Sequence, residues 1–226
     1  MIDVHYDCRM DANGKDPDAA SQILKMYNRN LWKRELPSGK IFDLDENLVY
    51  DGIPFSSDRM IPTFSKWKRY QNIIELADAQ DIERVVSLSW TIGGSIIFPS
   101  KPIEGFTINA ARGINKKIND RFDLTLECIK RYYDGKDSPL SECLYRYSFY
   151  FDLFVDFRGF VDFFFLNDLV DCSYESILFM HPFDEFSGNG LPQSINEYNA
   201  YLTKAKVFLE NRADRIDQWL NKGGIR

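Results

Sequence analysis

Three carboxylates, Asp120, Asp123 and Glu127, follow one another at i, i+3 and i+7. Residues at this spacing lie on one face of a helix. Grouped carboxylate oxygens suit Mg²⁺ and Mn²⁺. Lys130 and Asp134 continue the same face, however, and a mixed charge stripe opposite an apolar one is commonly a solvated helix surface. The pattern is compatible with Mg²⁺ or Mn²⁺ but assigns no metal ligand, so Asp120 and Asp123 are treated as candidate catalytic carboxylates.

Two arginines near these carboxylates are candidate ligand-binding residues. Arg112 stands in the small-residue stretch 110–113, directly after a predicted strand, where a backbone can approach a ligand closely. Its guanidinium fork matches a phosphate or a carboxylate. The alternative is a structural ion pair of Arg112 with Asp120 or Asp123, because buried arginines are normally paired. Arg121 is a second candidate for the same anionic ligand.

The most apolar part of the chain, residues 154–170, carries charged residues of its own. Arg158 and Asp162 are spaced i, i+4, so an internal ion pair is the simplest account of them. The alternative is a polar pocket lined by aromatic rings, where a carboxylate with a shifted pKa could perform acid–base work. Asp162 is therefore a third candidate catalytic residue, and Arg158 is a further candidate for ligand binding.

Two other segments resemble known binding motifs in part. Gly14-Lys15 lies in a turn-rich stretch, but Arg9 and Asp16 replace the first glycine and the serine or threonine of a Walker A loop. An EF-hand register starting at Asp11 fails at its fifth and sixth positions. The segment 66–70, KWKRY, could stack on bases, although a packed tryptophan with extended lysines is the simpler account.

Composition restricts the class of protein. The chain has 226 residues, 44% hydrophobic and 27% charged, as in soluble globular proteins. A net charge of −6 disfavours nucleic acid as a partner. Four scattered cysteines and two histidines disfavour a disulfide framework, a zinc site and a nucleophilic triad. The N-terminus lacks a signal-peptide pattern, and the longest apolar stretch, 160–170, is too short and too charged to span a bilayer. We therefore expect a cytoplasmic protein with no membrane segment.

Hydrophobic periodicity predicts an α+β fold, a single domain over residues 1–226 with several helices packed on a small, mainly antiparallel sheet. The aromatic share of 15%, including 18 Phe and 12 Tyr, predicts a core built on rings. Helices are predicted over about 19–32, 64–76, 81–87, 120–135, 138–155, 160–169 and, from a capping box at Ser194–Glu197, 194–222. Strands are predicted over 2–10, 41–44, 48–50 and 177–180.

An antiparallel hairpin is predicted at the centre of this fold. Its strands are 95–98 and 106–109, joined by the turn-forming residues 99–105. The pair Gly93-Gly94 before it lacks side chains and predicts a bulge or a close approach by another backbone. In this arrangement the second strand positions Arg112, and the helix that follows positions the carboxylates.

Long segments of the sequence also match a known family pattern. They are TIGGSIIFP (91–99), INAARG (108–113) and INDRFDLTLECIKRYYDG (118–135), with GKDPDAAS (14–21), FVDFRGFVDFFFLNDLV (154–170) and HPFDEF (181–186). On these segments the chain resembles a family of short bacterial proteins classed as a domain of unknown function. The resemblance covers nearly the whole chain and implies a single bacterial cytoplasmic domain. Because that family has no established activity, it supplies no catalytic residues.

Two functions remain open at this point. The first is a pocket of arginines and carboxylates that binds a small anionic or nucleotide-like ligand, with or without metal-dependent catalysis. It requires Arg112 and at least one carboxylate to line a common cleft. The second is a non-catalytic module that binds a protein partner or forms a homo-oligomer, and it requires an exposed apolar patch on residues 194–221.

Overall fold

The computed structural model describes residues 2–223, and it confirms the predicted α+β class. The strands are β1 Arg34–Glu35, β2 Ile41–Phe42, β3 Val49–Tyr50, β4 Ile53–Arg59 and β5 Ser95–Pro99. The α-helices are α1 Pro17–Ala20, α2 Gln22–Trp32, α3 Gln71–Ile74, α4 Ala79–Ser89, α5 Ile108–Ile114, α6 Phe122–Tyr133, α7 Ser141–Arg146, α8 Ser148–Phe151, α9 Phe157–Phe163 and α10 Ile195–Asn221. Four 3₁₀ turns are described as well: η1 Lys68–Tyr70, η2 Ile92–Gly94, η3 Asp152–Phe154 and η4 Asn167–Leu169.

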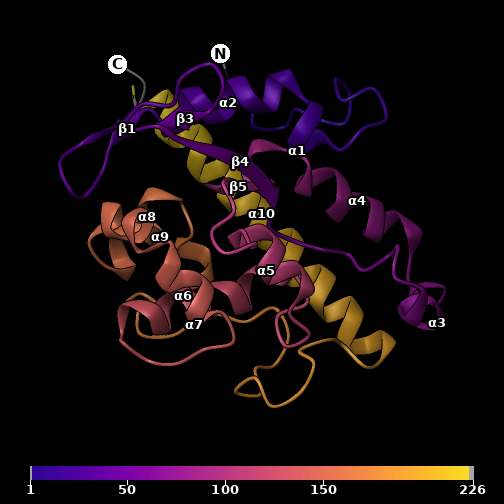
Figure 1. The fold of residues 1–226 in the computed structure, drawn as a ribbon. Helices are drawn as coiled ribbons and strands as arrows, with labels where there is room; N and C mark the ends of the chain where they lie inside the picture. The colour runs from indigo at the N-terminus through magenta and orange to yellow at the C-terminus, as the bar shows by residue number, and fades with distance from the viewer. Residues whose placement is uncertain (1, 224–226) are drawn as a thin grey trace.

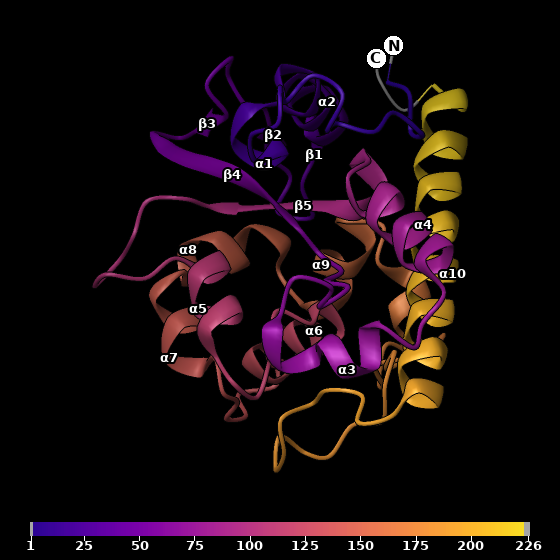
Figure 2. The same cartoon turned by 90° about the vertical axis from the view of Figure 1, so that its right-hand side faces the viewer.

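The long strands β4 and β5 cross the middle of the molecule (Figure 2). Helices α5 to α9 lie on one side of them, and the N-terminal elements α1, α2 and β1 to β3 lie on the other. Helix α10 runs along the flank, beside α4 (Figures 1 and 2). The two strands therefore separate a helical half from an N-terminal half, and α10 spans both.

The main sheet has the order β3-β4-β5 and is antiparallel throughout. Its longest ladder joins β4 to β5, from Phe55 opposite Pro99 to Arg59 opposite Ser95. Strand β3 pairs with the first two residues of β4 only, and α1 packs against β4 as well. A separate two-stranded sheet joins β1 to β2. The predicted small, mainly antiparallel sheet is confirmed, although β4 was not among the predicted strands.

The predicted central hairpin is wrong in its second strand. Residues 95–98 do form a strand, β5, but its partner is β4, and residues 108–109 open helix α5 instead. Thr107 explains the difference, because its side-chain oxygen accepts a hydrogen bond of 3.1 Å from the amide of Ala110 and so caps the helix. Arg112 therefore lies on a helix and not in a loop after a strand.

The predicted N-terminal strand, residues 2–10, is also absent from the structure. The alternation of polar and apolar residues arises here from consecutive turns. The carboxylates of Asp3 and Asp7 each accept a hydrogen bond of 2.9 Å from the amide two residues later, at His5 and Arg9. Such aspartate turns compete with extended structure.

Three predicted helices are shorter than expected, and residues with positive φ lie within or at the end of each. Phe64 (φ 59°) prevents the helix expected from residue 64, so only η1 and α3 form there. Val155 (φ 69°) follows η3 where the helix over 138–155 has already broken into short pieces, and Phe165 (φ 53°) separates α9 from η4. The predicted strand 177–180 is reduced to a single bridge between Val170 and Ile177. Since bulky residues rarely adopt positive φ, sequence patterns do not anticipate these breaks.

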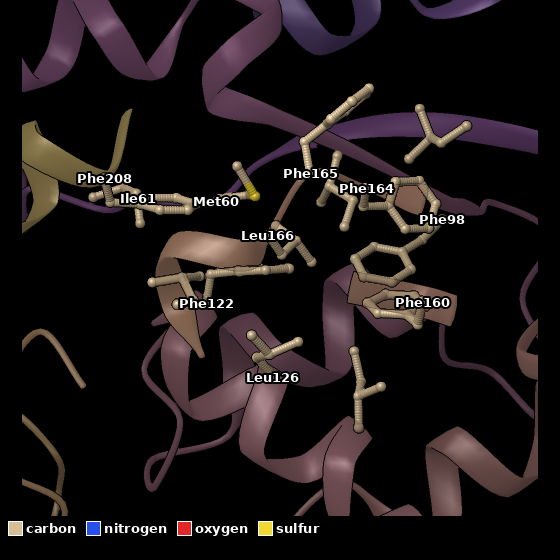
Figure 3. Close-up of a cluster of buried hydrophobic side chains, with 14 of the residues drawn as sticks. Met60, Ile61, Phe98, Phe122, Leu126, Phe160, Phe164, Phe165, Leu166 and Phe208 are labelled. Carbon is tan, nitrogen blue, oxygen red and sulfur yellow. The ribbon is translucent and has the colours of Figure 1, made fainter. Parts of the chain in front are cut away.

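The core consists largely of aromatic rings, as the composition predicts. Phe98 of β5 lies beside Phe160 and Phe164 of the helical half (Figure 3). The ring centroids of Phe160 and Phe164 are 5.0 Å apart, within the range of favourable aromatic pairs. All three side chains are fully buried. Within residues 2–223, no helix is both long and apolar enough to cross a membrane.

Candidate functional site

Arg112 of α5 is completely buried and engaged in a dense set of contacts. Its guanidinium pairs with the carboxylate of Asp58 and lies 3.4 Å from Oδ1 of Asp120. It also donates to the carbonyl oxygens of Asp120 (2.8 Å) and Met60 (3.2 Å) and to Oγ1 of Thr125 (3.3 Å). These bonds occupy the guanidinium fork, so Arg112 fastens the loop before α6 to the end of β4.

The charge state of Arg112 follows from these partners. Burial lowers the pKa of Arg112, but Asp120 and Asp58 more than compensate, and its pKa lies above the ordinary value. Arg112 and Asp120 are thus brought together, which agrees with both interpretations of Arg112, the ligand contact and the structural ion pair. Because the contacts of Arg112 are internal, the structural ion pair describes this residue better than a ligand contact.

Arg121 and Asp123 form a second internal pair. Both side chains are fully buried, and the guanidinium chelates the carboxylate. Arg121 also donates to the carbonyl oxygens of His181 (3.1 Å) and Gly190, while Asp123 accepts from the amide of Met180 (2.9 Å). The pair therefore holds the segment 180–190 against α6, and neither residue faces solvent.

Arg158 and Asp162 lie in a third place, on the surface of α9. Their Nε–Oδ2 distance is 3.6 Å, and the guanidinium carbon lies 4.9 Å from the centre of the Tyr174 ring. Asp162 accepts hydrogen bonds from the Tyr174 hydroxyl (2.6 Å) and the Asn167 amide (2.7 Å). No hydrogen bond or ion pair within residues 2–223 links this group to Arg112. The six candidate residues thus form three separate groups.

A cleft of about 740 Å³ opens beside the first of these groups. It is bounded by the N-terminal turns, the end of β4, the segment that follows β4, one face of α4 and the loop before α6. Its lining residues are Arg9, residues 14–17, Arg59, residues 62–67, Ile82, Glu83, Val86, Trp90 and Asp120. Asp120 is thus a sequence-predicted candidate that also lines this cleft.

The acidic side chains of the cleft already have partners. Asp120 pairs with Arg112, and Glu83 pairs with Arg9 at 2.8 Å. Asp16 accepts a hydrogen bond from the amide of Asp18 as the N-cap of α1. These contacts hold the carboxylates in place without fully neutralising them, because Arg9 also pairs with Asp7 and Arg112 also pairs with Asp58.

Three of the basic side chains, in contrast, are free. Within the described chain, Lys15, Arg59 and Lys66 have no carboxylate within 4.0 Å, and no side-chain hydrogen bond from them is present. The guanidinium carbon of Arg59 lies 4.8 Å from the centre of the Trp90 ring. Stacking on an indole orients a guanidinium without neutralising it. The cleft thus presents unpaired positive charge on a chain whose net charge is −6.

The backbone at two edges of the cleft adopts left-handed conformations. Phe64 has φ 59°, and Asn119 and Asp120 have φ 48° and 63°. Two consecutive non-glycine residues in this region are costly and require support from their surroundings. The amide of Asp120 donates to the carbonyl of Arg112 at 3.1 Å, and the Phe64 ring packs 5.1 Å from Trp67.

The sequence contains parts of this site but no indication that they meet. Gly14-Lys15 does not complete a Walker A loop, and for the segment 66–70 the sequence leaves base stacking and a packed tryptophan as alternatives. Arg59 lies on the strand that periodicity missed, and Trp90 follows α4 without any local motif. Their assembly depends on the pairing of β4 with β5, which no short-range pattern predicts. Within residues 2–223, no group of three or more His, Cys, Asp and Glu side chains could hold a metal ion.

Comparison with known proteins gives a family but no activity. A model described as a family of unknown function (DUF6994) matches residues 2–216 of the chain. No curated protein and no solved structure matches the chain significantly. The function must therefore be inferred from the geometry of the cleft.

Proposed function

Since the chain belongs to DUF6994, a family of unknown function, we propose from its geometry that it binds a small anionic ligand in the cleft beside β4. The observation that carries this proposal is the set of three unpaired cations, Lys15, Arg59 and Lys66, in one hollow. A phosphate or a similar oxyanion fits such a set, because a guanidinium fork and ammonium groups donate several charge-assisted hydrogen bonds to it.

The residues that line the cleft indicate which class of anionic ligand fits it. The cleft includes the aromatic side chains of Phe64, Trp67 and Trp90 beside the cations. Its volume accommodates a ligand of nucleotide size. Phosphate esters that carry a planar group, nucleotides among them, therefore match the cleft better than inorganic anions alone. Asp120 is the candidate acid–base group if the bound ligand reacts, whereas Arg112 acts from behind as its partner.

The second hypothesis, an interaction module, has less support. The stripe of α10 that it needs exposed is buried, including Tyr198, Leu202, Leu209 and Ile216. A homo-oligomer would have to use another surface. The cysteines Cys8, Cys128, Cys143 and Cys172 are all unpaired, which supports the proposal of a reducing, cytoplasmic location.

The first test measures anion binding by the full chain. We expect pyrophosphate and adenosine triphosphate to raise the melting temperature with increasing concentration, because a ligand of the native state stabilises it. Isothermal titration then gives the affinity. Arg59→Gln should weaken binding about tenfold or more, since a charged hydrogen bond contributes roughly 1.5–3 kcal/mol. The affinity of Arg59→Lys should lie between that of the wild-type chain and that of Arg59→Gln.

Matched controls separate this site from general charge effects. Arg29 is exposed and has no ion pair within residues 2–223, so Arg29→Gln removes the same charge away from the cleft. Lys66→Gln, which removes another unpaired charge of the cleft, should also weaken binding. Lys206→Gln, at an exposed position outside the cleft, is its control. Equal weakening by Arg29→Gln and Arg59→Gln would contradict the proposal, and so would binding that no variant of the cleft reduces.

A further inference from the structure

A group of carboxyls lies behind the cleft, around the end of β4. Asp58 pairs with Arg112, which it shares with Asp120. Asp18 belongs to α1, which packs against β4, and its main-chain carbonyl oxygen accepts a hydrogen bond of 3.4 Å from the hydroxyl of Ser57, the neighbour of Asp58. Its charge acts on Arg112, and the charge of Asp58 acts on Asp18. The Oδ1 atom of Asp18 is buried and has no hydrogen-bond partner within residues 2–223. Two carboxyls therefore share the Arg112 guanidinium, and the third, Asp18, has no ion pair within residues 2–223.

Such a group favours the binding of a proton. A buried, unpartnered carboxylate oxygen is costly while it is charged, and the cost disappears when the group is protonated. Burial, with a further contribution from Asp58, raises the pKa of Asp18 to about 7. Burial also raises the pKa of Asp58 to about 6, against the opposing effect of Arg112. Both carboxyls thus titrate near neutral pH.

The charged and titratable groups around the pair come from several elements. Asp16 of α1 and Asp120 of the loop before α6 favour protonation of the nearest carboxyl, whereas Arg112 of α5 and Arg59 of β4 oppose it. The Ser57 hydroxyl lies beside Asp18 as well, but it donates to the main-chain carbonyl oxygen of Asp18, at 3.4 Å, and not to the carboxylate. Arg59 is the member of this set with an unpaired charge, and it lines the cleft.

Arg59 therefore connects the cleft to the carboxyl pair. Its positive charge stabilises the ionised forms of both Asp18 and Asp58. An anion bound to Arg59 adds negative charge at the same place and offsets that stabilisation. Since a nearby negative charge favours the neutral form of a carboxyl, the pair then binds a proton more tightly.

We propose that the cleft takes up its anion together with a proton, which is held by the Asp18–Asp58 carboxyl pair. This inference rests on the proposed function, because it requires the anion to bind beside Arg59. The coupling is reciprocal, so protonation of the pair strengthens anion binding. Affinity for the anion therefore rises as the pH falls from 8 to 6.

The test uses sulfate, which remains a dianion over this range and does not contribute a proton of its own. Sulfate is titrated into the full chain at pH 6, 7 and 8, with the ionic strength held constant by chloride. We expect the affinity of the wild-type chain to be about fivefold higher at pH 6 than at pH 8. Asp18→Asn should bind sulfate with nearly the same affinity at all three pH values.

Further variants test whether the pH dependence of sulfate binding comes from Asp18. Asp214 is exposed on α10 and has no ion pair within residues 2–223, so Asp214→Asn should keep the wild-type pH dependence. If Asp18→Asn does not fold, Asp18→Ser serves instead and should likewise bind sulfate with nearly the same affinity at all three pH values, because it also lacks the titratable carboxyl. A pH dependence retained by Asp18→Asn or by Asp18→Ser overturns the inference.

The two proposals fail in different ways. Wild-type binding that is lost in Arg59→Gln but does not vary with pH overturns proton uptake and leaves the anion site standing. Binding of pyrophosphate or adenosine triphosphate without any binding of sulfate overturns the proton uptake alone. Binding that Arg59→Gln does not weaken, or no binding of sulfate, pyrophosphate or adenosine triphosphate at any pH, overturns the anion site and the proton uptake with it.

Discussion

At the scale of single residues, Arg112 determines whether the carboxyls behind the cleft can coexist. It is fully buried, and it pairs with both Asp58 and Asp120 while its remaining donors bind carbonyl oxygens. A buried ion pair contributes little net stability compared with apolar residues of the same shape, but its removal from one side leaves an uncompensated charge. The residue is therefore expected to be structural, and its loss costly.

Arg112→Met should lower the free energy of unfolding by about 3–5 kcal/mol at pH 8. The loss should be smaller at pH 5, because Asp58, whose pKa is already raised to about 6 by burial, is then protonated and needs no partner. Urea unfolding at the two pH values measures both effects. Arg29→Met, at an exposed position, is the control, and a loss that is the same at both pH values would contradict this account.

At the scale of elements, η2 packs closely against α4 and α10 because Gly93 and Gly94 have no side chains. A Cβ atom at Gly94 would lie 2.4 Å from the carbonyl oxygen of Ser89, and one at Gly93 would lie 3.1 Å from Cβ of Ala213 in α10. The close approach predicted from Gly93-Gly94 is thus confirmed. Arg212 of α10 adds hydrogen bonds to the carbonyls of Gly93 (2.6 Å) and Ser95 (2.8 Å).

Gly94→Ala should therefore destabilise the protein by about 3 kcal/mol, since backbone atoms cannot move aside as a flexible side chain does. Gly113→Ala is the matched control, because a Cβ atom there meets nothing within 4 Å and the residue lies inside α5. It should stabilise the protein by roughly 0.5–1 kcal/mol. Thermal and urea unfolding of both variants test the pair. Similar changes in the free energy of unfolding of both variants would show that the close approach at Gly94 does not affect stability.

The sequence predicts the elements that are marked by local chemistry. The capping serine Ser194 begins α10 where expected, with its side chain bonded to the amide of Glu197 at 3.3 Å. The helix near Asp120 and the strand at residues 95–98 are also found. Strand β4 is different, because Ile53–Arg59 contains Pro54, two serines and an aspartate and lacks a clear alternation. Its existence depends on pairing with β5.

In the candidate site, too, the sequence predicts contacts between neighbouring segments but not those between distant ones. Sequence reasoning placed Arg112 near Asp120, and this contact exists because only a short turn separates α5 from α6. It could not place Arg59 against Trp90, or Lys15 near Lys66, since these contacts join segments that are distant along the chain. The roles proposed from sequence for Asp123, Asp162, Arg121 and Arg158 remain predictions, and their observed contacts are structural ones.

At the scale of the whole molecule, the carboxyl of Asp18 behind the cleft should control how the free energy of unfolding depends on pH. The folded state raises the pKa of Asp18 to about 7, chiefly through burial, whereas an unfolded aspartate titrates near 4. Between these values the folded chain binds more protons than the unfolded chain. Stability from this group is therefore fully present below about pH 4 and is lost as the pH rises through 7.

The wild-type chain should accordingly be less stable at pH 8 than at pH 5, by an amount of the order of 2 kcal/mol. Asp18→Asn removes the charge that burial penalises, so its free energy of unfolding should rise toward the pH 5 value and vary less with pH. Urea unfolding from pH 5 to 8 measures this, with Asp214→Asn as the exposed control. If stability instead increases over this range and Asp18→Asn leaves the slope unchanged, Asp18 is ionised in the folded chain. The proton proposed for the cleft would then have no place to bind.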